Sequence, residues 1–212
     1  MLSYLYLLVQ RIISLFQVWI RTTSPNETSS YFLILGGSRY REIECAKLIS
    51  KMLTNTTHSI IILSSGCSSS DEISHLFQKT ENCYVYIDHR AVDTLSNFTT
   101  LAYDLQKSGC RSLVVATSEA HISRAYPIGQ IILGSFGISI SKCACFNKYD
   151  KSAKDETLRR QVRDICRALI WLIFQWDGRD IATFFHPDRR PIETETSFSY
   201  HTERDRGRLR SF

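Results

Sequence analysis

The chain has 212 residues, of which 43% are hydrophobic and 22% charged, so it is long enough to bury a sizeable core in one ordinary domain. The formal net charge of +5 permits anionic partners. No recognition-helix, zinc-finger or aromatic RNA-binding pattern accompanies that charge, which argues against nucleic acid as a partner.

The cysteines number seven, an odd count without a repeated spacing. We therefore expect reduced thiols in a cytoplasmic protein. Cys143 and Cys145 have the spacing of half a metal site, but no second Cys or His pair at zinc spacing accompanies them. We predict no metal site, and the sequence assigns no cofactor.

Residues 1–24 predict an amphipathic helix. Apolar and aromatic residues dominate positions 2–20, yet the polar residues fall within about a third of the helical wheel. A helix that crosses a membrane has no use for such a stripe, and a signal peptide would have a basic residue before the apolar run. We expect the helix either to pack on its own domain or to lie on a membrane surface, and a membrane-anchored protein is the alternative.

Short apolar runs of strand length alternate with longer amphipathic segments in residues 30–178. The expected strands lie near 32–35, 60–63, 84–87, 113–116 and 138–140, and the expected helices near 41–53, 71–79, 94–108 and 121–136. Strands that alternate with helices of this length form a parallel sheet covered on both faces. The predicted fold is an α/β domain, a Rossmann-like three-layer sandwich with a mainly parallel five-stranded sheet, an N-terminal amphipathic helix and a long C-terminal helix.

The last long helix should run from about Asp155 to Trp176. Its apolar positions repeat at three and four and are expected to face the core: Leu158, Val162, Ile165, Cys166, Leu169, Leu172, Ile173 and Trp176. Four arginines share another sector, which predicts a solvated face, with phospholipid contact as the alternative: Arg159, Arg160, Arg163 and Arg167. Residues 187–212 are polar without an apolar period, which predicts a loosely ordered tail.

Polar residues and glycines follow each of the first four predicted strands. In chain order they are Gly36, Gly37, Arg41 and Glu42; Ser65 and Gly66; Asp88, Arg90, Asp93, Thr94 and Asn97; and Thr117, Ser118, His121 and Arg124. The carboxyl ends of parallel strands meet at one edge of a sheet, where the N–H groups of helix N-termini also converge. The sequence therefore predicts a single polar crevice.

Turn formation and helix capping explain some of these residues. Asp93, Thr94 and Ser118 are of the types that cap helices, and the dinucleotide Gly-x-Gly-x-x-Gly fingerprint is absent. Capping does not require Arg90, His121 or Arg124. Arginine forks suit a phosphate or carboxylate ligand, and a histidine exchanges protons near neutral pH.

At these positions the chain resembles the YdcF/SanA/ElyC-like family, in its cyanobacterial-type variant. The matching segments are 34–37 with Arg41 and Glu42, 64–66, 88–97 and 116–125, within about residues 31–140. The resemblance implies a Rossmann-like fold with a largely unassigned activity and, in some relatives, an N-terminal membrane segment and a link to envelope biogenesis. The chain departs from the family pattern at three positions of the third strand end, where it has Asp88, Asp93 and Ser96 in place of Glu, Asn and an acidic residue.

Two main functions are compatible with these residues. One is an enzyme that acts on a phosphorylated or otherwise anionic small molecule, either nucleotide-linked or an envelope precursor, in which Arg41, Arg90 and Arg124 neutralise the anion. Thr94, Asn97 and Ser118 would then orient it. His121 would transfer a proton, with Asp88 or Asp93 as its partner or as a base for water. The other is a non-catalytic ligand-binding or sensor module with the same crevice, and a membrane-peripheral scaffold is a third possibility.

Overall fold

The computed structural model describes residues 2–21, 31–53, 59–64, 70–77, 83–145 and 158–176. The predicted tail at 187–212, and the predicted site residues Ser65 and Gly66, lie outside the described residues. The strands are β1 (Tyr31–Leu35), β2 (Ser59–Ser64), β3 (Cys83–Asp88), β4 (Ser112–Ser118) and β5 (Ser139–Cys145). They form one sheet in the order β3-β2-β1-β4-β5, and every pairing is parallel. The expected α/β domain with a parallel sheet is confirmed.

Seven helices lie in the described part of the chain. They are α1 (Leu2–Arg21), α2 (Arg39–Met52), α3 (Ser70–Phe77), α4 (Ser96–Thr99), α5 (Ala102–Lys107), α6 (Glu119–Gly134) and α7 (Leu158–Phe174). The single helix expected at 94–108 is divided into α4 and α5. At the division, the Thr100 hydroxyl hydrogen-bonds both the Ser96 carbonyl and the Asp88 carboxylate, each at 2.8 Å. Such side-chain bonds compete with regular helix pairing.

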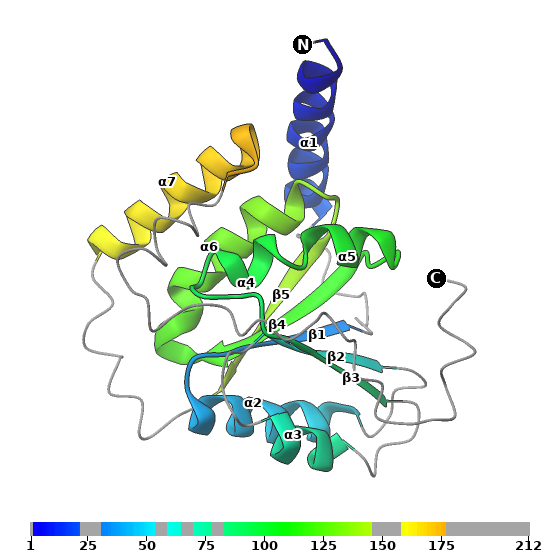
Figure 1. The fold of residues 1–212 in the computed structure, drawn as a ribbon, viewed down its shortest axis with the longest axis vertical. Helices are drawn as coiled ribbons and strands as arrows, with labels where there is room; N and C mark the ends of the chain where they lie inside the picture. Colours follow the sequence, from blue (N-terminus) through cyan, green and yellow to red (C-terminus); the bar gives the residue numbers. More distant parts are fainter. Residues whose placement is uncertain are drawn as a thin grey trace.

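The sheet separates two hydrophobic clusters because successive strand residues point to opposite faces. Along β1, Phe32 and Ile34 join the cluster that contains residues of α2 and α3, whereas Leu33 and Leu35 join the cluster that contains residues of α4, α5 and α6. Figure 1 shows α2 and α3 on one side of the sheet and the other helices on the opposite side. The helices that follow β1 and β4 therefore cover different faces.

Helix α6 is the centre of its layer, and two glycines let its neighbours approach closely. A Cβ at Gly129 would lie 2.8 Å from Phe98 Cε1 of α4, and a Cβ at Gly134 would lie 2.8 Å from Leu15 Cδ1 of α1. Such contacts are too short for a side chain at either position. Helix α1 thus packs on its own domain through its C-terminal half, one of the two arrangements expected for it.

The expected orientation of α7 is wrong. Leu158, Val162, Leu169, Ile173 and Trp176, all predicted to face the core, are between 41% and 78% exposed. Of the eight apolar positions predicted to face the core, only Leu172 is buried. The side of the helix that faces the domain consists of Asp164, Ala168, Trp171 and Leu172. The helix is rotated because Trp171 stacks near Phe136 and the Asp164 carboxylate pairs with arginines.

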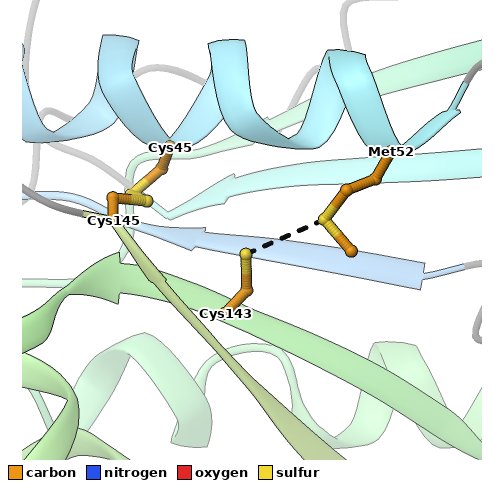
Figure 2. Close-up of a disulfide and its surroundings, with 4 residues drawn as sticks. All are labelled: Cys45, Met52, Cys143 and Cys145. Atoms are coloured by element: carbon orange, nitrogen blue, oxygen red, sulfur yellow. Dashed lines mark hydrogen bonds between the residues drawn. A yellow bond between two sulfur atoms is a disulfide. The ribbon is translucent and has the colours of Figure 1, made fainter.

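A disulfide joins Cys45 of α2 to Cys145 at the end of β5, so the expectation of uniformly reduced thiols is wrong for this pair (Figure 2). The two residues are 100 positions apart in sequence, which is why no spacing pattern revealed them. Two residues before Cys145 in β5, the Cys143 thiol lies 4.0 Å from the sulfur of Met52, the last residue of α2.

Candidate functional site

The turn after β1 has the shape that its two glycines allow. Gly37 has a φ of 111°, a conformation that favours glycine, and a Cβ there would lie 3.0 Å from the Arg41 guanidinium. The Gly37 N–H donates to Glu42 Oε1 at 2.9 Å, and Arg41 donates to the Gly36 carbonyl oxygen. Arg41 and Glu42 are both buried. These two residues, which we predicted to bind ligand, therefore hold the turn in shape.

The end of β4 lies beside that turn. In the parallel register Ile34 pairs with Ala116, so Gly36 and Ser118 each lie two residues beyond the last pair. Thr117 and Ser118 are 0% and 1% exposed. Within the part of the chain that the structure describes, Thr117 Oγ1 and Ser118 Oγ are buried without a hydrogen-bond partner. Buried hydroxyls of this kind are rare and call for an explanation.

Helix N-termini meet at the same place. Ser38 is the N-cap residue of α2 and Ser118 that of α6, and neither side chain makes a capping hydrogen bond. The chain leaves β1 and β4 toward opposite faces of the sheet, and in open α/β sheets ligands bind at such a change of direction, at the carboxyl ends of adjacent strands. The first N–H groups of a helix point outward and favour anions.

His121 and Arg124, three residues apart on α6, contact each other as their spacing indicated. Arg124 Nη2 lies 3.2 Å from His121 Nδ1 and donates to Thr94 Oγ1 at 2.9 Å. Because a guanidinium can only donate, Nδ1 accepts the hydrogen bond and the neutral imidazole carries its proton on Nε2. His121 is 6% exposed and Thr94 is 8% exposed. This contact brings the segment after β3 against the helix after β4, as predicted.

Helix α7 also reaches this cluster, which sequence reasoning missed. Asp164, 3% exposed, pairs with Arg163 at 2.8 Å and with Arg124 Nε at 3.9 Å. Arg167 pairs with Asp93 at 2.8 Å and lies 3.8 Å from Asp164. An acid in the middle of the arginine sector was the signal that α7 has a polar contact with the domain.

Asp93 begins the turn that leads into α4. Its carboxylate accepts the Ser96 N–H and the Ser96 hydroxyl, each at 2.8 Å. The same hydroxyl accepts the N–H groups of Val92 and Asp93. Burial opposes ionisation of Asp93, yet the Ser96 backbone N–H and the Arg167 charge together hold the pKa of that carboxyl below its usual value. Ser96, at a position that departs from the family pattern, thus organises the loop.

Asp88 and Arg90 form a separate cluster. Asp88 Oδ1 accepts the Arg90 backbone N–H at 3.0 Å and Nε at 2.8 Å, and Arg90 Nη2 pairs with Asp104 at 2.7 Å. Burial disfavours the charge of Arg90, but the hydrogen bonds to Asp88 and Asp104 prevail and raise its pKa. The geometry therefore gives Arg90 a structural role between two carboxylates. A catalytic role for Asp88 or Asp93 stays a prediction, although both carboxylates already accept several hydrogen bonds.

Asn97 is 7% exposed in α4, one residue after Ser96. The described residues contain no group of three or more His, Cys, Asp and Glu side chains placed to hold a metal ion.

Comparison with known proteins found no match: no family model, no curated protein and no solved structure matches the chain.

Proposed function

We propose that this domain is Rossmann-like and binds an anionic small molecule, one that contains a phosphate group or a nucleotide, between the turn after β1 and the start of α6. The observation that carries the proposal is the pair of buried hydroxyls at Thr117 and Ser118, which have no hydrogen-bond partner in the described chain. A phosphate oxygen accepts from such hydroxyls. Hydroxyls at this depth would otherwise cost folding free energy.

The charges around this position favour an anion. The N-termini of α2 and α6 direct their partial positive charges toward the carboxyl edge, and the two helices have 14 and 16 residues. Arg124 adds a full charge on the first turns of α6, where its guanidinium also contacts Thr94. The Gly36–Gly37 turn supports close approach of the ligand because it carries no side chain.

His121 gives the site a group for acid/base chemistry. Its Nδ1 accepts from Arg124, so Nε2 is the atom that would exchange a proton with the ligand. Arg124 and Thr94 would orient the ring. If the protein only binds or senses its ligand, the same contacts serve affinity alone, and turnover separates the two functions.

The resemblance to the YdcF/SanA/ElyC-like family, and the envelope-related metabolism that it implies, belongs to the same proposal. The Cys45–Cys145 disulfide favours a domain on the oxidising side of a membrane. One described helix, with its window at Ser3–Ile20, is long and apolar enough by length and composition to cross a membrane. We propose that the domain is membrane-associated.

Mass spectrometry of small molecules that co-purify with the protein, followed by titration calorimetry with inorganic phosphate, nucleotides and sugar phosphates, tests the proposal. Ser118→Ala should weaken binding about tenfold or more, because a hydrogen bond to a charged ligand contributes roughly 1.5–3 kcal/mol. Ser123→Ala is the matched control. Ser123 lies on the same helix, is exposed, and donates to the Ala120 carbonyl.

His121→Ala separates catalysis from binding. Equal affinity with lost turnover across the same compounds identifies an enzyme, and equal affinity with no turnover in the wild type identifies a binding module. If none of the phosphate compounds binds, or if Ser118→Ala and Ser123→Ala bind like the wild type, the ligand is not an anion at this crevice.

A further inference from the structure

Helix α1 turns its apolar face away from the domain. Its domain side carries Leu15 and Val18, which approach Gly134 of α6, together with Arg11. Ser3, Gln10 and Gln17 are exposed, but most of the exposed residues are apolar or aromatic, between 39% and 68% exposed: Tyr4, Leu5, Tyr6, Leu7, Val9, Ile12, Ile13, Phe16, Trp19 and Ile20. A helix that packed only on its own domain would have the opposite arrangement.

Arg11 fixes this orientation. Its guanidinium carbon lies 4.8 Å from the Phe136 ring centroid, 5.7 Å from that of Trp171 and 5.8 Å from that of Tyr103. It also donates to the Tyr103 hydroxyl at 2.9 Å, and that hydroxyl donates to Gln175 Oε1 at 2.9 Å. A cation held among three rings is a favourable contact. We call this arrangement the Arg11 clamp.

The clamp limits how far α1 can enter a bilayer. A helix of 20 residues is about 30 Å long, which is the thickness of a hydrocarbon core. Arg11 is midway along it, and the half that follows packs on α6. Only the half before Arg11 extends beyond the domain, and Figure 1 shows it projecting from the molecule. While the clamp is closed, α1 can enter one leaflet but cannot cross both.

Helix α7 brings a second apolar surface to the same end of the molecule. Its C-terminal half exposes Leu169, Ile170, Ile173 and Phe174, between 41% and 68%, and Trp176, two residues after the helix ends, is 50% exposed. Gln175 joins this end of α7 to the Arg11 clamp through Tyr103. The C-terminal end of α7 points toward α1 in Figure 1. The exposed apolar residues of the two helices thus lie in the same region of the molecule, where α1 and α7 contact each other.

Positive charge borders this region. Arg159, Arg160 and Arg163 are exposed on the N-terminal half of α7, and the single acid of that helix, Asp164, is buried. Exposed arginines beside an apolar surface complement the phosphate headgroups of an anionic leaflet. Trp19 and Trp176, which are 68% and 50% exposed, are of the type that lies at the level of headgroups.

We propose that α1 and α7 together dock the protein on one leaflet of an anionic phospholipid bilayer. The attachment is monotopic because the Arg11 clamp limits how deeply α1 enters the bilayer. The N-terminal half of α1 and the C-terminal half of α7 enter the leaflet, and the arginines of α7 contact its headgroups. This proposal rests on the membrane association proposed above and does not depend on the ligand proposed for the crevice. It concerns an interaction surface on the α6 side of the sheet.

Flotation of the purified full chain with vesicles of phosphatidylcholine, with and without phosphatidylglycerol, tests the surface. Binding should be stronger with phosphatidylglycerol. Phe174→Glu and Ile170→Glu should each reduce binding at least tenfold, and Arg159→Glu with Arg160→Glu should remove the preference for the anionic lipid. Tyr40→Glu is the matched control, because Tyr40 is 69% exposed on α2, across the sheet. Circular dichroism reports whether each variant is folded.

Tryptophan fluorescence gives a readout that needs no disruptive variant. Brominated lipids should quench the Trp19→Phe protein more than the protein with both Trp19→Phe and Trp176→Phe, since only the first retains the exposed tryptophan that follows α7. Equal quenching of the two proteins, or binding that Phe174→Glu and Ile170→Glu leave intact, would overturn the proposal, and so would a full chain that forms dimers and ignores both kinds of vesicle.

Discussion

At the scale of single residues, Asp93 links pH to stability. The pKa of its carboxyl lies below the usual value in the folded protein, despite burial, because of the Ser96 N–H and the Arg167 charge. A lowered folded-state pKa contributes stability that is present above the unfolded pKa of about 4 and is lost as the pH falls through the folded pKa. We predict that Asp93→Asn lowers the free energy of unfolding by about 1–3 kcal/mol at pH 7, and by progressively less below about pH 4. Urea unfolding at pH values from 7 down to about 3 measures the difference.

The Arg167→Gln background is the control for that prediction. Without the Arg167 charge, the effect of Asp93→Asn at pH 7 should shrink, because one of the groups that hold the carboxylate in its ionised form is gone. An effect of Asp93→Asn that stays constant down to pH 3 would contradict the role given to the carboxylate charge.

Residue types and positions in the candidate site were predictable, but their partners were not. Helical spacing brought His121 and Arg124 together, and both lie in the first turns of the helix that follows β4, as expected. Arg90 was expected to meet a ligand, yet Asp88 and Asp104 surround it. That pairing depends on the division between α4 and α5, which local periodicity does not reveal.

At the scale of elements, α7 is part of the candidate site because of one buried acid. Asp164 pairs with Arg124 of α6 and with Arg163 and Arg167 of its own helix. We predict that Asp164→Asn destabilises the protein by about 3 kcal/mol, since a buried pair that loses one partner leaves the other charge uncompensated. It should also weaken binding at the crevice, because Arg124 loses its support. Chemical unfolding and calorimetry measure the two effects.

Arg163→Gln provides the comparison within the same helix. Its side chain is 61% exposed, so the loss of its pair with Asp164 should cost under about 1 kcal/mol and leave the crevice unchanged. Should Asp164→Asn prove as mild as Arg163→Gln, α7 would not support Arg124.

The apolar period of α7 predicted a helix correctly and its orientation wrongly. Periodicity locates an apolar stripe but does not say what covers it. Here the domain side is decided by Asp164, Ala168 and Trp171, and much of the stripe stays exposed. A helix with two apolar faces, one for the core and one for a partner, cannot be oriented from its sequence alone.

At the scale of the whole molecule, alternation of strands and helices predicted the parallel sheet, because right-handed crossovers of this length leave few other topologies. Long-range pairs such as Cys45 and Cys145 are outside the reach of such reasoning. They lie 100 positions apart and meet only after β5 has been placed beside β4, with α2 across its face. The reduced state expected from the cysteine count is wrong for this pair for that reason.

The disulfide should contribute to the stability of the whole domain, since it closes a long loop of chain and joins α2 to the last strand. We predict that Cys45→Ala with Cys145→Ala lowers the free energy of unfolding by about 2–4 kcal/mol, and that a reductant has the same effect on the wild type but little on the variant.

Alkylation of the folded protein at pH 8 should modify the exposed Cys166. It should spare Cys83 and Cys110, because burial raises the pKa of these thiols to about 11 and about 12. Cys166→Ala, which removes an exposed thiol, is the control for stability. Label on Cys45 or Cys145 in the unreduced protein would show that the pair is not oxidised, and would restore the reduced thiols that the sequence had suggested.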